Sequence, residues 1–306
     1  MSIVDFSQLP IPDLISNIDY EEILKQRKES FIALFPSQKD KDSWGIILTR
    51  ESEPVVKLLQ ENAYLEMLYK NKCNEDARSL LLAYAKGSDL DHLALTEYGL
   101  TRLLVTPENI TVVPPLSAVY ESDERLRERC LLSFEAMNTA GSANAYRFFS
   151  LSADGRVYGV KVYSPEENPY LLDIIISQID SFNAEASAEL INIVQNALDP
   201  EEIRPVCDRP TVKSSIAKEF QIVARLFMGK NAEDSLMLEA ANIRINKYID
   251  QVKKNGSSIR LSAIYAALHV DGISRVVIDQ PQTDIEIDTW HHAYCNSVNI
   301  SIGGTE

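Results

Sequence analysis

Three residues near the C-terminus are of the types that bind zinc. His291, His292 and Cys295 supply nitrogen and sulfur ligands, and His291 and Cys295 would share a face if their segment were helical. A zinc site needs three or four ligands, and the other two histidines are distant in the sequence. The surrounding pattern indicates strand and loop, so we expect an ordinary polar segment and no metal site.

A second candidate for metal binding is acidic. Asp284, Glu286 and Asp288 alternate along a segment predicted to be a strand, which would place three carboxylates on one face. Calcium sites draw their oxygens mainly from loops with a tight glycine turn. The pattern therefore favours a solvated strand face that discourages pairing with other strands.

No segment carries a catalytic or cofactor-binding motif. Ala140–Asn144 has the small residues of a phosphate-binding turn but lacks the P-loop lysine and the dinucleotide fingerprint, so it is predicted to be a helix break. The sequence contains no GxSxG, HExxH or kinase signature. Among 45 acidic residues, a carboxylate pair of the glycosidase type stays open because only geometry can identify one. Glu124–Arg129 is expected to be a solvated helix face with local ion pairs, with a partner contact as the alternative.

Composition limits the class of protein. The 306 residues are 45% hydrophobic and 25% charged, which is typical of soluble globular proteins of two or three domains and excludes collagen-like or wholly disordered chains. The net charge of −15 repels phosphate backbones and anionic lipids, so nucleic acid and membrane are poor partners. No run of 18 apolar residues and no basic, apolar secretory start occur. The four dispersed cysteines indicate reduced cytoplasmic thiols.

The first part of the chain is predicted to be helical. One helix begins after Asp19, whose spacing to Glu22 is that of a capping box, and ends before Pro36. A longer helix begins near Pro54 and runs toward Gly87, with a break near Asn71–Asn74. A third is expected between an N-cap at Ser88 and a C-terminal glycine at Gly99.

The longer helix carries more apolar residues than one neighbouring helix can cover. Its apolar side chains between Val55 and Tyr69 spread beyond a single stripe, so the helix is expected to have two or more partners. The residues predicted to form a protein interface are Val55, Leu58, Leu59, Leu65, Leu68 and Tyr69.

After a boundary at Pro114-Pro115 the pattern changes. A charged helix over 122–137 and an apolar segment ending at Asp154-Gly155 precede two modules of strands and helices. The predicted strands are 157–163, 171–178, 211–214, 218–228, 275–279, 285–288 and 298–302. The predicted helices are one ending near Leu198, one containing Leu238–Val252 and closed by Asn255-Gly256, and one over 261–268.

These elements predict an α+β fold, with an N-terminal helical region followed by two small α/β modules with mixed sheets. The expected divisions are a helical region 1–115, a helical connector 116–155, a first module 156–215 and a second module 216–306.

Several segments, in order along nearly the whole chain, resemble the baseplate J family of contractile-tailed phages. They are Glu51–Pro54, Ala83–Ala94, Glu121–Glu124, Ala140–Ser142, Ala145–Phe148, Leu151–Val157, Ala188–Leu190, Arg204-Pro205 with Asp208-Arg209, Ile259–Val270 and Ile302–Gly304. One departure concerns the turn after the second strand, where relatives tend to have glycines and this chain has Asp180–Ala184.

The resemblance implies a structural component of the baseplate wedge, without catalysis, metal or cofactor. Copies would pair within each wedge, join two other wedge proteins and neighbouring wedges, and close into a ring around the central hub and spike. The N-terminal helices would enter a mixed bundle, and the C-terminal region would mediate contacts between copies. The protein would be assembled in the bacterial host cytoplasm and end in the virion tail baseplate of a phage, a phage-derived bacteriocin or another contractile injection device.

Two other functions stay open from the sequence. A tail-associated cell-wall hydrolase would use two of the many carboxylates and would show a near-neutral titrating acid in a cleft. A cytoplasmic ligand-binding protein would be a stable monomer with no exposed apolar helix face.

Overall fold

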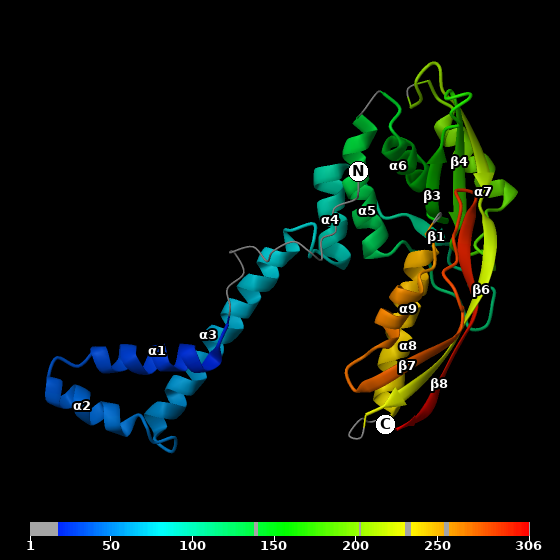
Figure 1. Ribbon diagram of the computed structural model, residues 1–306. Coiled ribbons are helices and arrows are strands. Elements are labelled where there is room, and N and C mark those ends of the chain that lie inside the picture. Colours follow the sequence, from blue (N-terminus) through cyan, green and yellow to red (C-terminus); the bar gives the residue numbers. More distant parts are fainter. Residues whose placement is uncertain (1–17, 138–139, 202, 230–233, 254–256, 306) are drawn as a thin grey trace. The chain divides into compact units, whose positions relative to one another are not determined.

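The structure is a computed structural model that describes residues 18–137, 140–201, 203–229, 234–253 and 257–305. The chain divides into two compact units, Met1–Thr101 and Arg102–Glu306. Helices form the first unit, and helices with small mixed sheets form the second (Figure 1). The predicted α+β class is confirmed.

The described part of the first unit contains α1 (Tyr20–Ala33), α2 (Gln38–Ile47), α3 (Pro54–Ser79) and α4 (Gly87–Tyr98). The predicted start of α1 is confirmed, because the Asp19 carboxylate accepts a hydrogen bond from the Glu21 backbone N–H at 2.9 Å. The predicted end of α4 is also confirmed, because Gly99 adopts the left-handed conformation with φ 66°.

Three expectations for this unit were wrong. Helix α2 is separate and was not predicted. Helix α3 continues unbroken through Asn71–Asn74, because no glycine or proline follows Pro54 within it. It ends at Ser79, well before Gly87. Helix α4 begins before Ser88, with Lys86 in the N-cap position, since the Lys86 carbonyl already accepts the N–H of Asp89.

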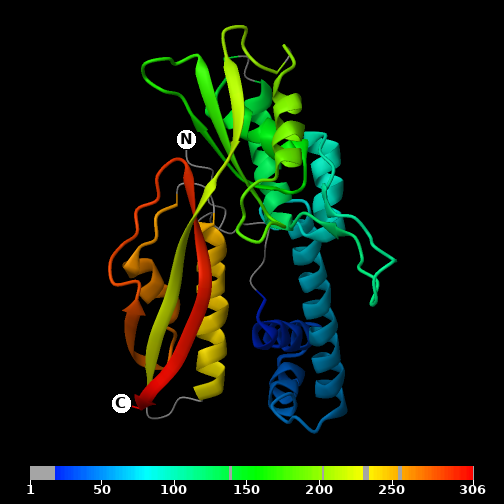
Figure 2. The ribbon, with the colours of Figure 1, turned by 90° about the vertical axis from the view of Figure 1, so that its right-hand side faces the viewer.

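The second unit opens with β1 (Leu104–Thr106) and β2 (Val119–Tyr120), which pair antiparallel. Residues 107–118 between them form a projecting segment that we call the arm, visible in teal in Figure 2. Whereas the sequence suggested a boundary at Pro114-Pro115, the division between the compact units falls after Thr101. Residues 102 and 103 already belong to the second unit, because Arg102 donates to the Glu121 carbonyl at 2.7 Å.

The next elements are α5 (Asp123–Ser133), a 3₁₀ turn (Phe134–Met137), α6 (Ala143–Ala153), β3 (Val157–Tyr163), β4 (Leu171–Gln178), α7 (Ala188–Leu198) and β5 (Arg209–Ser214). The sheet has the order β3-β4-β5, with β3 antiparallel and β5 parallel to β4. The hairpin of β3 and β4 has the predicted bounds. Ser122, Ser142 and Ser187 cap α5, α6 and α7 by accepting backbone N–H groups.

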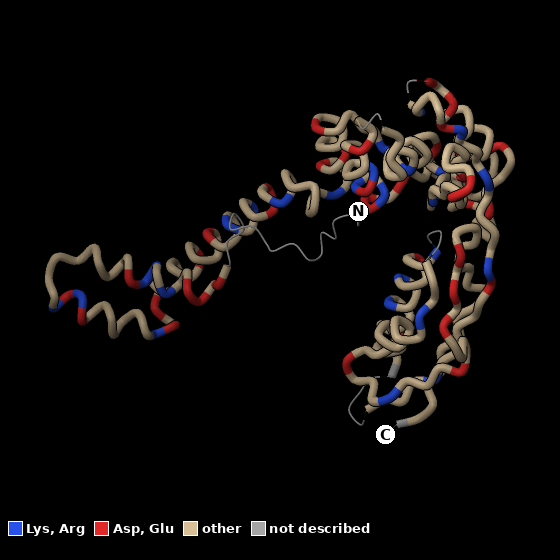
Figure 3. The backbone as a smooth tube through the Cα atoms, turned by 45° about the horizontal axis from the view of Figure 1, so that its top comes forward, with Lys and Arg blue, Asp and Glu red and all other residues tan. Residues whose placement is uncertain are grey.

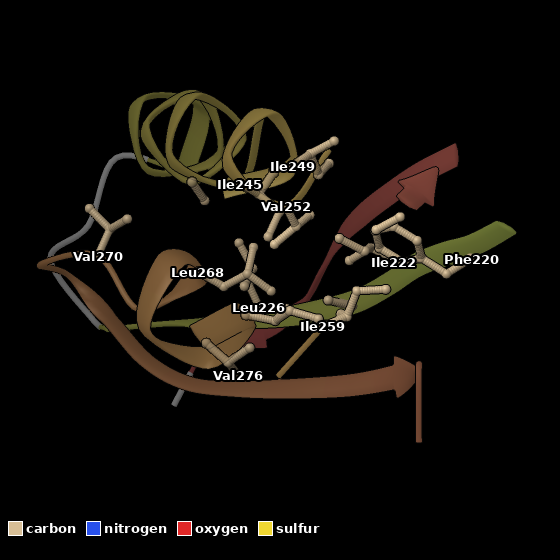
Figure 4. Close-up of a cluster of buried hydrophobic side chains, with 14 of the residues drawn as sticks. Phe220, Ile222, Leu226, Ile245, Ile249, Val252, Ile259, Leu268, Val270 and Val276 are labelled. Carbon is tan, nitrogen blue, oxygen red and sulfur yellow. The ribbon is translucent and has the colours of Figure 1, made fainter. Parts of the chain in front are cut away.

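The last elements are β6 (Ile216–Met228), α8 (Asp234–Val252), α9 (Leu261–Leu268), β7 (Ile273–Gln280) and β8 (His291–Thr305). The sheet order is β7-β6-β8, with β7 antiparallel and β8 parallel to β6. Apolar side chains of α8, α9 and the sheet fill one core, in which Ile222, Leu226, Ile245 and Leu268 are fully buried (Figure 4). Two mixed sheets therefore follow the helices, as expected.

Two strand predictions in this module need correction. Residues 285–288 are not a strand, and Ile285 makes only an isolated backbone pair with Ile259. Strand β8 is much longer than the predicted 298–302 because it pairs with β6 along most of that strand. The predicted helix end at Asn255-Gly256 lies outside the described residues.

Candidate protein interface

Helix α3 has one face that packs inside its own unit. Val56, Leu59 and Ala63 are buried there against Ile23 and Leu24 of α1 and Leu48. The Glu66 carboxylate beside this core accepts from Lys70 at 2.9 Å and forms an ion pair with Arg27 of α1 at 2.6 Å. These two cations, with Lys70 as the larger influence, hold the pKa of Glu66 below its usual range.

The other face of α3 carries large apolar side chains, interspersed with Glu61 and Asn62, that are uncovered within the described residues. Leu58, Leu65 and Tyr69 are 58%, 55% and 70% exposed, and they follow one another at spacings of seven and four. Leu68 and Tyr64 widen this strip. At 3.6 residues per turn, Leu58 and Leu65 lie on the side of the helix roughly opposite Ala63. We call Leu58, Tyr64, Leu65, Leu68 and Tyr69 the outer face of α3.

The structure sorts the six predicted interface residues into two groups. Leu58, Leu65, Leu68 and Tyr69 lie on the outer face, whereas Leu59 is buried in the unit's own core and Val55 packs against it. Sequence reasoning omitted Tyr64, which is 51% exposed. Tyr64 could have been predicted as an interface residue, because residues four apart lie on the same side of a helix and Tyr64 precedes Leu68 by four. That the outer face binds a partner stays a prediction.

The histidine and cysteine cluster lies in β8 and is used structurally. Asp288 accepts from His291 Nδ1 at 2.6 Å, and this contact holds the pKa of the Asp288 carboxyl below its usual range. His292 is fully buried, and its Nε2 donates to the Asn183 carbonyl at 2.7 Å. Burial lowers the pKa of His292, which keeps the ring neutral. In the described residues, no group of three potential ligands is placed to hold a metal.

The alternating acidic residues bind a side chain of their own molecule. Arg260 forms ion pairs with Asp284 at 3.2 Å and with Glu286 at 2.5 Å. The Leu261 backbone N–H and the Arg260 guanidinium together lower the pKa of the Asp284 carboxyl. The prediction of a strand was wrong, because the segment is an irregular loop that pairs with the start of α9. The predicted exposure of its carboxylates to solvent is confirmed.

The predicted helix break at Ala140–Asn144 is confirmed. Ser142 caps α6 and accepts the Ala145 N–H at 3.1 Å, while its hydroxyl donates to Glu135. An acidic partner at this position opposes a bound phosphate.

The charged turn 124–129 was wrongly expected to be a solvated face. The Arg125 guanidinium donates to the backbone carbonyl of Gly155 at 2.8 Å and to that of Val157. Arg129 and Glu121 form a buried ion pair whose side chains are 4% and 0% exposed. The Leu103 N–H also donates to Glu121 at 3.0 Å, so this pair ties β1 to α5.

Acidic and basic residues are interspersed along both units and do not separate into an acidic and a basic part (Figure 3). In the portion of the chain that the structure describes, no helix is long and apolar enough to span a membrane.

Comparison with known proteins identifies the family. The model of the Baseplate J-like N-terminal domain matches residues 51–109, and that of the Baseplate J-like protein C-terminal domain matches residues 220–301. Baseplate protein J of Escherichia phage P2 is 41% identical over 306 residues, covering 100% of both chains.

A chain in the six-fold symmetrised cryo-EM structure of the anti-feeding prophage baseplate is 15% identical, with a TM-score of 0.37. The match covers 60% of this chain and 46% of that one, so this chain spans under half of its length. The full-length similarity to the P2 protein and the two domain matches show that the chain belongs to the baseplate J family, whose members are structural components of the phage tail baseplate.

Proposed function

We propose that the protein is a non-enzymatic component of the baseplate wedge. It pairs with a second copy, binds two other wedge proteins and contacts neighbouring wedges, and the wedges close into a ring around the central hub and spike. The single observation that carries this proposal is the outer face of α3, which is apolar and uncovered within the described residues of its unit.

The size of the outer face supports a role in permanent assembly. Full burial of each large apolar side chain contributes about 1.5–3 kcal/mol relative to exposure. Several such side chains on one helix match the pattern of an amphipathic helix that enters a groove between other helices. The opposite face of α3 already packs on α1, so a partner helix would complete a bundle around α3.

The proposed mechanism is mechanical. Contacts through α3 hold the subunit in its wedge, while weaker contacts between wedges rearrange when the tail meets a cell and sheath contraction starts. A cross-link that joins adjacent wedges should therefore block contraction. Full contraction with that cross-link in place would contradict the mechanism.

The assembly proposal is tested by co-expressing the chain with the other baseplate proteins encoded beside it. Size-exclusion chromatography with light scattering then gives the mass of the complex. We expect a complex with the wild-type chain and its loss with the double variant Leu58→Asp, Leu65→Asp, because two carboxylates would be buried in an apolar contact.

The matched control is Leu34→Asp, which makes the same change at a residue that is 80% exposed and outside α3. It should leave the complex intact. A wild-type chain that stays monomeric beside its neighbours, or a double variant that still assembles fully, would overturn the proposal.

A further inference from the structure

We propose that the arm of one copy docks in a cavity of a second copy, and that two copies exchange arms in this way. The inference rests on the self-pairing in the proposed function and names the surface that makes it. Its elements are the arm, residues 107–118, and a cavity of about 670 Å³ in the second unit.

The arm has a defined conformation. Asn109 and Leu116 form an antiparallel backbone pair, with N–H to carbonyl distances of 2.9 and 3.0 Å. At the tip, the Asn109 side-chain oxygen accepts from the Thr111 N–H at 3.0 Å and from its hydroxyl at 2.6 Å. The arm is thus a short ribbon whose shape is fixed before binding, which reduces the entropy lost on docking.

Beyond Glu108, the surface of the arm is apolar and uncharged. Val113 is 98% exposed, Ile110 74% and Leu116 55%. From Asn109 through Tyr120 there is no charged residue, although 25% of the whole chain is charged. Depletion of charge with exposed apolar side chains is the composition of the centre of a protein interface rather than of a solvated loop.

The cavity has an apolar rim that matches this composition. Phe182, Tyr120 and Ile179 on the rim are 91%, 56% and 41% exposed, and Tyr294 lies beside Phe182 with ring centroids 6.1 Å apart. An aromatic side chain exposed to this degree on a rim is typical of an anchor for a partner.

Charged residues also line the cavity, and they are Glu121, Glu124, Arg125, Glu128, Lys247, Asp250 and Lys253. Two of the hydrogen-bond donors in the lining are bound by the chain itself. Arg125 donates to two backbone carbonyls, and the Tyr158 hydroxyl donates to the Asp250 carbonyl at 2.7 Å. Because these donors are already bonded, the surface that the cavity offers to a docked segment is mostly apolar.

A second copy of the arm is the occupant that the geometry favours. Val105 of β1, with Val119 and Tyr120 of β2, lines the cavity, so the arm leaves directly from the cavity wall. In a pair of copies related by a two-fold axis, each arm then starts beside the cavity that receives its partner's arm. One isologous interface would contain both contacts.

Disulfide trapping between two differently tagged copies tests the exchange. Cys73 and Cys207 are exposed and are first changed to Ser. Burial raises the pKa of Cys130 to about 11 and also raises that of Cys295, so these thiols stay unreactive. One copy carries Val113→Cys and the other Phe182→Cys, so a disulfide between positions 113 and 182 can form only between two chains.

We expect at least tenfold more covalent dimer from this pair than from a control pair in which Val206→Cys replaces Val113→Cys. Val206 is 84% exposed and lies outside the arm. Equal yields from the two pairs would overturn the inference. The trapping is repeated in the complex with the neighbouring baseplate proteins, so that the result does not depend on the strength of self-association alone.

A second variant separates this inference from the proposed function. Ile110→Asp with Val113→Asp should raise the self-dissociation constant at least about tenfold, with unchanged thermal unfolding and unchanged binding of the other baseplate proteins. If self-pairing persists at wild-type strength, the arm exchange is wrong while the wedge proposal stands. If Leu58→Asp with Leu65→Asp also leaves assembly intact, the wedge proposal is wrong as well.

Discussion

Glu121 and Arg129 form a buried ion pair in the second unit. Both side chains are nearly inaccessible to solvent, and Glu121 also receives the Leu103 N–H. Arg129→Met would leave the carboxylate buried without its cation, which costs about 3–5 kcal/mol of unfolding free energy. Chemical denaturation of the purified chain measures this loss.

A double variant provides the control for this pair. Glu121→Leu with Arg129→Met removes both charges, so it should be destabilised less than the sum of the two single variants. A double variant that is as unstable as that sum would show that the two groups act independently.

Ala184 stores backbone strain in the turn after β4. It has φ 62°, the left-handed region, and is 5% exposed. Ala184→Gly removes this strain, whereas Ala145→Gly, at a residue that is 4% exposed in α6, loses helix propensity. Thermal unfolding should find Ala184→Gly more stable than Ala145→Gly by about 2 kcal/mol, and equal stabilities would contradict the strain.

At the scale of elements, β1 approaches the turn between α6 and β3 so closely that only glycine fits at position 155. A Cβ on Gly155 would lie 2.3 Å from the Leu104 carbonyl oxygen. Gly155→Ala should therefore push β1 away and lower the unfolding free energy by about 3 kcal/mol.

The control is Gly45→Ala in α2, where a Cβ has no neighbour within 4 Å. It should be neutral or stabilising, because alanine favours a helix more than glycine does. If denaturation gave the same effect for both variants, close contact at Gly155 would not be the cause.

Local pattern predicted the elements that are punctuated by turns and caps. The hairpin of β3 and β4 and the helix 261–268 have their predicted bounds. Helix α2 was not predicted because its sequence is polar and it buries no residue. Trp44 positions this helix, since the centroid of its ring lies 5.3 Å from that of Phe31 and 5.5 Å from that of Phe35. Such a tertiary contact leaves no periodic pattern in the sequence.

At the scale of the whole molecule, the sequence indicated that α3 needs more than one partner but not which of its faces is free. Leu58 and Leu59 are adjacent and equally apolar in the sequence, yet one is exposed and the other is buried. The side on which α1 and α2 pack makes this difference, and that depends on the fold of the unit. For the arm, the sequence indicated only a boundary at Pro114-Pro115, because the exposure of Val113 is a property of the folded unit.

The most direct test of the role of α3 is a cryo-electron microscopy structure of the assembled baseplate that contains this chain. We expect Leu58, Leu65 and Tyr69 to be buried against helices of another subunit in every copy. Side chains of the outer face that remain exposed to solvent in the complete baseplate would contradict the proposed role of α3.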